Sequence, residues 1–444
     1  MKRGRQRREK QGLSAKGMFN EVRKSLKNIY TRPTTSGRPR EISVIDCIMS
    51  AVAMFSIKSP SLLAFDHLLH YQGTIIKHNL RTLFGIVQAP YDTRMREVLD
   101  EVNPRDLRCA FLSIFELIQR GQLLADYQFL GTHLLAIDGT GMFESNKIHC
   151  QNCCEKHHRN GQISYYHHAL AGAIVHPYKK QVIPLCPEPI VKHDGLTKND
   201  CEQNASRRFL DDIKTEHPRL KLTILSDALH ATAPQINYLN SLGYGFILNV
   251  KPGSHSSLFD WLRGLELKAV AVTHGKNKYN FRFINNIPLN GGQDAPEINF
   301  LECKAVEVEG KKAVERLFTW VTTHTINEKN VYELMCAGRT RWKIENETFN
   351  TLKNQGYQFG HNFGHGRKNL TTVFALLMLL TFLIDQVQEA ACGLFQTALV
   401  KKRSKKNLWS SVRGLFENVF ISSWEDFFLA LAGAKHARLT MNSS

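Results

Sequence analysis

The spacing of hydrophobic residues predicts helices over residues 41–125. Apolar side chains recur there every three or four positions, as at Ile45, Ile48, Met49 and Val52. This period places them along one face of an amphipathic helix. Pro60 interrupts the pattern, and further segments of helical period follow it. We therefore expect an all-helical domain in this region.

From about residue 126 the pattern changes to short apolar runs. Five such runs predict strands, at 133–137, 164–175, 181–187, 220–225 and 245–250. Helical spacing returns before each of the last two runs, at 200–216 and 233–242. Three hairpin-like strands followed by alternating helices and strands indicate a mixed α/β domain, whose limits we place at 126–385.

Polar turns separate four further β-rich segments, at 270–273, 279–284, 300–308 and 316–323. We interpret the surrounding region, 251–330, as a β-meander inserted into the α/β domain. The longest apolar run, 373–384, is shorter than the roughly 20 residues that cross a bilayer, so it predicts a buried helix. The remaining residues, 386–444, are expected to form a helical tail and are a candidate for oligomerisation.

The charge balance indicates that the chain binds a polyanionic partner. The 444 residues hold 58 Lys or Arg against 40 Asp or Glu, a net charge of +18, which favours nucleic acid over a membrane. Residues 1–40 hold thirteen of these basic residues and only two acidic ones, so eleven of the eighteen excess charges lie there. We interpret this segment as a basic flexible arm that contacts phosphates, with a merely solvated tail as the alternative. If the chain binds DNA, the helical domain over 41–125 is the candidate DNA-binding domain.

The cysteines point to metal ligands or core positions. No apolar stretch follows the basic residues near residue 1, so no secretory signal is expected, and the ten cysteines are expected to stay reduced in the cytoplasm. Between 149 and 158, cysteines and histidines stand at the spacing that zinc knuckles use. The candidate ligands of a structural zinc are Cys150, Cys153, Cys154 and His157, with His167 and His168 as further donors. Ordinary loop and core residues remain the alternative, because no second Cys-x-x-Cys pair follows.

Two aspartates stand where predicted strands end. Asp138 follows the run 133–137, and Asp227 follows the run 220–225 and Ser226. Side chains at the carboxyl ends of strands project into the crevice where α/β sheets bind ligands. Carboxylates there could share Mg²⁺ or Mn²⁺, and two such ions promote phosphodiester cleavage. Either aspartate alone could equally form a turn or cap a helix.

A third acid lies on a predicted helix, in the sequence Arg341-Trp-Lys-Ile-Glu345. Glu345 could complete a metal site with the two aspartates, and Glu347 is its rival for that role. The candidate DNA contacts on this segment are Arg339, Arg341 and Lys353. A surface helix with ordinary charge pairs is the alternative.

The three motifs together resemble the DDE transposases of bacterial insertion sequences, in the group with a β-insertion before the Glu. The resemblance covers about 130–385: a strand ending in Asp-Gly-Thr, a strand ending in Asp, and a helix with Arg-Trp-x-Ile-Glu, separated by 89 and 118 residues. Two positions depart from the family pattern. Gly338 stands where the family has a Tyr, and Leu352 stands where it has a basic residue, with Lys353 one position later.

The resemblance implies a ribonuclease H-like mixed sheet and a catalytic triad of Asp138, Asp227 and Glu345 that holds two Mg²⁺ or Mn²⁺ ions. It also implies cleavage and transfer of DNA strands at the inverted-repeat ends of a mobile element, and insertion into target DNA. Its partners would be double-stranded DNA and a second copy of the chain, in the bacterial cytoplasm at the nucleoid, with no membrane. The alternatives are a ribonuclease H-like nuclease without strand transfer, and a zinc-containing DNA-binding protein that has lost catalysis.

Overall fold

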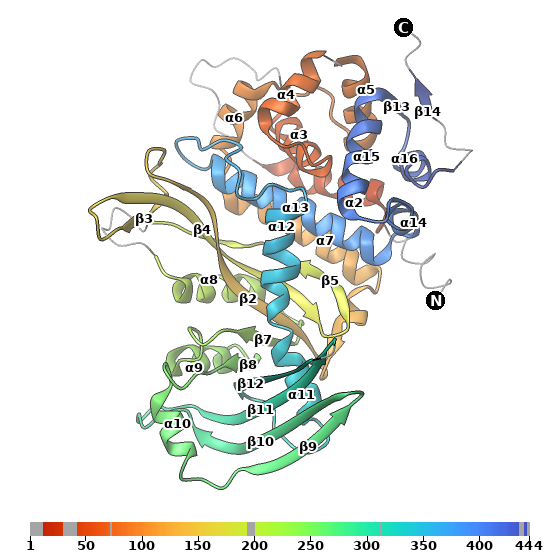
Figure 1. The fold of residues 1–444 in the computed structure, drawn as a ribbon. Helices are drawn as coiled ribbons and strands as arrows, with labels where there is room; N and C mark the ends of the chain where they lie inside the picture. The colour runs from red at the N-terminus through yellow and green to blue at the C-terminus, as the bar shows by residue number, and fades with distance from the viewer. Residues whose placement is uncertain are drawn as a thin grey trace.

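The fold is mixed α/β, as the sequence predicted. The computed structural model of the chain describes residues 12–29, 42–71, 73–192, 200–310, 312–434 and 439–441. Helices from both halves of the chain gather into one body, and a 12-stranded mixed sheet extends away from it (Figure 1). The sheet forms one end of the molecule, and the helical body forms the other.

The first half of the helical body comes from the amino-terminal region. Its elements are α2 (Ala15–Ser25), η1 (Leu26–Asn28), α3 (Val44–Ser56), α4 (Leu62–Tyr71), α5 (Gly73–Phe84), α6 (Asp92–Asp100), η2 (Pro104–Leu107), α7 (Arg108–Arg120) and η3 (Leu124–Tyr127). The prediction of a flexible arm over 1–40 is wrong for residues 12–29. There α2 buries Met18, Phe19 and Val22 and packs against α7. Residues 1–11 and 30–41 lie outside the described residues.

The predicted strands form the centre of the sheet. They are β2 (Thr132–Ser145), β4 (Ile163–His176), β5 (Lys179–Pro184), β7 (Leu222–Ser226) and β8 (Gly245–Asn249), joined by α8 (Glu202–Glu216) and α9 (Ala233–Ser241). Three short strands were not predicted: β1 (Gln128–Phe129), β3 (Cys154–His157) and β6 (Glu188–Ile190). β4 pairs antiparallel with β2 and β5, whereas β7 runs parallel to both β2 and β8.

The inserted β-segments extend this sheet and do not fold as a separate layer. After α10 (Ser256–Leu262) come β9 (Lys268–His274), β10 (Asn277–Pro288), β11 (Glu297–Glu309) and β12 (Lys312–Thr322). Each strand of this meander pairs antiparallel with the next, and β12 then pairs antiparallel with β8. The insertion thus lengthens the sheet beyond the strands that carry the candidate acids (Figure 1).

The carboxy-terminal part returns the chain to the helical body. Its elements are α11 (Val331–Arg339), η4 (Ile344–Phe349), α12 (Asn350–Asn354), α13 (Leu370–Ala391), α14 (Gly393–Lys402), α15 (Lys405–Asn418), β13 (Val419–Ile421), α16 (Trp424–Leu431) and β14 (Leu439–Met441). The helix α13 is long and apolar enough to cross a membrane, but 89% of its apolar window is buried, as a core helix would be. The buried helix predicted there is confirmed.

The predicted helical tail packs against the amino-terminal helices of its own chain. The Asn79 side chain on α5 donates hydrogen bonds to the carbonyl oxygens of Phe416 and Val419, at 2.9 and 2.8 Å. The Trp424 indole donates to the Leu83 carbonyl at 2.8 Å. The two ends that the sequence separated as a domain and a tail therefore share one core.

Candidate active site

Asp138 on β2 and Asp227, directly after the end of β7, lie at matching positions in neighbouring segments of the sheet. The parallel strands β2 and β7 are last paired at Ala136 and Leu225, and each aspartate follows its paired residue by two positions. Neighbouring strands are about 4.8 Å apart, so the two aspartates lie close together, and the negative charge of Asp227 contributes to the pKa of Asp138. The expectation that a strand ends at Asp138 is wrong, because β2 continues to Ser145. What ends before Asp138 is the pairing with β7.

Arg341 links Glu345 to Asp138. The guanidinium of Arg341 lies between two carboxylates: its Nη1 is 3.3 Å from Asp138 Oδ2, and its Nη2 is 2.6 Å from Glu345 Oε1. Glu345 lies in η4, which is a π-helical segment, and such segments are frequent at functional sites. Arg341, predicted to contact DNA, is bound to acids of its own chain here.

The two aspartates have opposite electrostatic surroundings. Burial raises the pKa of Asp138 to about 6; Arg341 opposes this shift, and the negative charges of Glu345 and Asp227 add to it. A contact with His230, whose Nδ1 lies 3.5 Å from Asp227 Oδ1, holds the pKa of Asp227 below its usual range. Neighbouring acids with pKa values pushed apart are typical of active sites. The sequence analysis missed His230, although it stands only three residues after Asp227.

Glu202 is a further acid that the sequence analysis missed. It begins α8, and its carboxylate lies directly over Gly139, where an added Cβ would be 2.3 Å from Glu202 Oε1. Its Oε1 is also 3.6 Å from His168 Nε2. Glu202 therefore lies beside the residue that follows Asp138. Nothing in its local sequence marks it, because only the packing of α8 on the sheet brings it there.

The structure separates Glu345 from its rival Glu347. Glu345 contacts Arg341, whereas Glu347 lines a surface pocket with Tyr178 and Lys343, away from that guanidinium. Burial lowers the pKa of Lys343, and the charge of Glu347 opposes that shift. Of these two acids, Glu345 is the one brought to Asp138.

The other predicted DNA contacts have different surroundings. Arg339 forms a two-pronged ion pair with Glu307 and lies over the Phe318 ring, 4.8 Å from its centroid. The Arg339 guanidinium is therefore already bound to residues of the inserted strands β11 and β12. Lys353, on α12, is exposed to solvent. Trp320 stacks on Phe318 and is 1% exposed, so it is buried in the meander.

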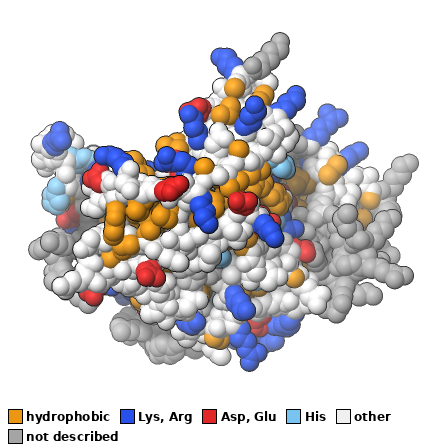
Figure 2. Space-filling view, turned by 90° about the horizontal axis from the view of Figure 1, so that it is seen from below, with side chains coloured by type: hydrophobic (Ala, Val, Ile, Leu, Met, Phe, Trp, Pro, Cys, Tyr) orange, Lys and Arg blue, Asp and Glu red, His pale blue; other side chains and the backbone are white. Residues whose placement is uncertain are grey.

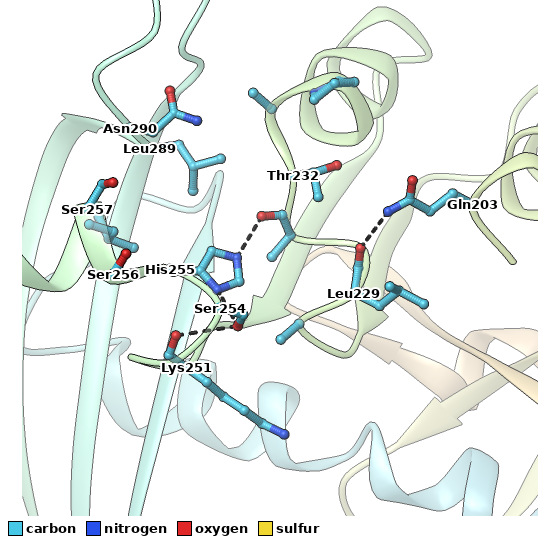
Figure 3. A pocket seen from close by; sticks show the side chains of 15 residues that line it. Gln203, Leu229, Thr232, Lys251, Ser254, His255, Ser256, Ser257, Leu289 and Asn290 are labelled. Atoms are coloured by element: carbon cyan, nitrogen blue, oxygen red, sulfur yellow. Dashed lines mark hydrogen bonds between the residues drawn. The ribbon is translucent and has the colours of Figure 1, made fainter. Parts of the chain in front are cut away.

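A cavity of about 750 Å³ opens at the loop that follows β7 (Figure 3). Its polar lining includes Gln203, Thr232, Lys251, Ser254, His255 and Asn290. The loop after β7 is held in place there, since the Gln203 side chain donates to the Leu229 carbonyl at 2.9 Å and His255 Nε2 lies 2.8 Å from the Ala231 carbonyl. The residue next to Asp227, Ala228, belongs to the same wall.

A separate cluster of cysteines and histidines lies at the β3–β4 hairpin. Its members are Cys150, Cys153, His167 and His365. Among the described residues, it is the one group of three or more His, Cys, Asp or Glu whose ligand atoms all lie within 4.8 Å of one another. The assignment of Cys154 and His157 to it is wrong. β3 directs Cys154 toward the Ile190 carbonyl at 3.5 Å, and His157 is exposed, 3.6 Å from Glu155.

Comparison with known proteins adds no family to this geometry. No protein-family model matches the sequence, and no curated protein matches it. The class of protein is therefore argued from the arrangement of the site.

Proposed function

We propose that the chain is a DDE transposase, which cleaves and transfers DNA strands with Asp138, Asp227 and Glu345 as its acidic triad. The observation that carries the proposal is the position of the acids. Asp138 on β2 and Asp227 directly after β7 stand at matching positions in neighbouring parallel segments. Glu345 is linked to Asp138 from a helical segment through Arg341. A structural ion pair alone would not need the second aspartate at a matching position.

The order of the central strands supports a ribonuclease H-like core. Along the sheet they run β5-β4-β2-β7-β8, with the first three antiparallel and the last two parallel to β2. Asp138 is on β2 and Asp227 follows β7, the two strands at the middle of this order. The inserted strands β9–β12 fall between Asp227 and Glu345 in the chain, where the resembled transposases have their β-insertion.

The triad offers the type of ligand atom that a hard divalent cation takes. All three side chains offer oxygen ligands; Asp138 and Asp227 are half-buried, and Glu345 is exposed. Burial raises the pKa of Asp138 most; Arg341 opposes this shift, and the charges of Glu345 and Asp227 add to it. A bound cation would favour the ionised carboxylate. When bound, Mg²⁺ or Mn²⁺ would lower the pKa of water and stabilise charge on the leaving oxygen. With the acids so occupied, Arg341 is placed to bind a phosphate.

The surroundings suit DNA as the substrate. Lys and Arg side chains are spread over the face shown in Figure 2, and the whole chain carries a net charge of +18. The cavity at the loop that follows β7 offers a lysine, hydroxyl groups and an amide to a nucleotide next to the reacting phosphate (Figure 3). Acting on two DNA ends together would require two copies of the chain.

The proposal is tested with DNA fragments that end in the sequences flanking the coding region. In Mg²⁺ we expect cleaved and joined products from the wild-type chain. Asp138→Asn and Glu345→Gln should lose at least about 10³-fold in rate, because several kcal/mol of charge stabilisation depend on each ligand. Glu347→Gln is the matched control from the same helical segment and should stay within about tenfold of wild type.

Three outcomes would contradict the proposal. Equal cleavage by Asp138→Asn and wild type would contradict the assignment of Asp138 to a catalytic triad. Cleavage without any joined product would favour a nuclease. DNA binding without cleavage in Mg²⁺ or Mn²⁺ would favour a DNA-binding protein that lacks catalysis.

A further inference from the structure

Four side chains from three separate segments converge at the β3–β4 hairpin. Cys150 and Cys153 lie in the turn between β2 and β3, and His167 lies on β4. His365 comes from the loop before α13. Nothing in the proposed chemistry uses this cluster.

The distances within the cluster match a tetrahedral ligand set. The Sγ atoms of Cys150 and Cys153 are 3.8 Å apart. His167 Nε2 lies 3.5 Å from Cys150 Sγ and 3.4 Å from Cys153 Sγ. His365 Nε2 lies 3.4 Å from Cys153 Sγ. Tetrahedral zinc, at about 2.3 Å from sulfur and about 2.05 Å from nitrogen, separates two sulfur ligands by about 3.8 Å and a sulfur from a nitrogen by about 3.6 Å.

The cluster is also closed in the way that structural sites are. Cys153, His167 and His365 are buried, and Cys150 is half-buried. Four protein ligands complete a tetrahedral set and leave no position for water or substrate. The other ring nitrogen of His365 lies 3.4 Å from Thr371 Oγ1, a contact of the kind that orients a metal-binding imidazole.

We propose that this cluster binds one structural zinc ion through two thiolates and two imidazoles. Such a soft donor set selects zinc over magnesium, so the site is independent of the three acids. The ion fastens the β3–β4 hairpin to the loop before α13. Because β4 pairs with β2 at Asp138, the zinc joins a strand beside Asp138 to a loop that follows Glu345 in the chain. The zinc site does not rest on the proposed function.

Zinc content of the full chain, purified without chelator, tests the proposal. We expect one zinc per chain in the wild type by elemental mass spectrometry. Cys153→Ser and His365→Ala should lose it. Two matched controls should keep it: Cys154→Ser, at the neighbouring buried thiol, and His361→Ala, in the loop of His365.

Cobalt keeps the test decisive if the ligand variants do not fold. Wild-type chain, stripped of metal and titrated with Co²⁺ alone, should bind one equivalent and develop the visible absorption of a tetrahedral site with thiolate ligands. Zinc should then displace the cobalt and abolish the colour. A wild-type chain that holds no zinc and takes up no tetrahedral cobalt, or ligand variants that retain full zinc, would overturn the proposal.

Discussion

Replacing Asp138 by Asn should stabilise the chain at neutral pH when no divalent metal is present. Burial raises the pKa of the Asp138 carboxyl from 3.8 to about 6. Each pKa unit corresponds to about 1.4 kcal/mol, so the ionised carboxylate destabilises the fold by about 3 kcal/mol. The side chain is only 22% exposed, so solvent screens little of this penalty. Below about pH 4 the carboxyl is protonated whether folded or unfolded, and the penalty vanishes; it grows between about pH 4 and pH 6 and is constant above.

Thermal unfolding in chelator measures this effect. For 444 residues, an unfolding entropy of about 2.1 cal/mol/K per residue converts about 3 kcal/mol into a Tm gain of about 3 °C. We expect that gain for Asp138→Asn at pH 8 and almost none near pH 4. Asp260→Asn, at a 63% exposed carboxylate on α10, is the control and should change Tm little at either pH. Mg²⁺ should raise the Tm of wild type but not of Asp138→Asn. A loss of Tm in Asp138→Asn at pH 8, or an equal gain at both pH values, would refute the electrostatic reasoning.

Two further substitutions test buried contacts in the helical body and beside the inserted strands. Lys58 is fully buried with its Nζ 2.7 Å from Asp385 Oδ2, so Lys58→Met should cost about 3–5 kcal/mol in urea unfolding by leaving a buried charge unpaired. Adding Asp385→Leu should recover most of that loss, and a single variant as stable as wild type would contradict this. At Gly338 an added Cβ would lie 2.6 Å from the Trp320 indole nitrogen, so Gly338→Ala should cost about 1–3 kcal/mol. Gly414→Ala on α15 meets open space and should be neutral or stabilising; equal losses at both glycines would reject the steric explanation.

The central sheet could be predicted because its strands are marked locally. Runs of apolar residues bounded by turns mark β4, β7 and β8 within a few residues of their observed limits. The helical body could not be predicted as one unit, because its contacts join residues far apart in the chain, such as Asn79 with Phe416. The apolar face of α2 was overlooked among basic residues. This face consists of Met18, Phe19 and Val22, a short helical stripe inside a strongly charged segment.

The candidate site divides in the same way. Asp138, Asp227 and Glu345 could be named from their motifs because each follows a recognisable local pattern. Glu202 could not be named, because it reaches the site only through the packing of α8. Two of the proposed zinc ligands, Cys150 and Cys153, could be named from the Cys-x-x-Cys spacing. His365 could not be named, because it comes from a distant segment of the chain. Cys154 and His157 have a suitable spacing in the sequence, but their side chains lie away from the cluster.

The two departures from the transposase pattern have physical causes in this fold. The position of the expected Tyr is Gly338, and the Trp320 indole fills the space that a side chain would need. Lys353, the basic residue that stands one position late, is on α12 directly after η4, the π-helical segment that contains Glu345. A π-helical turn holds one more residue than an α-helical turn, so residues beyond it are delayed by one in phase. Leu352 is accordingly buried and Lys353 exposed, which is the exposure that a phosphate-binding side chain needs.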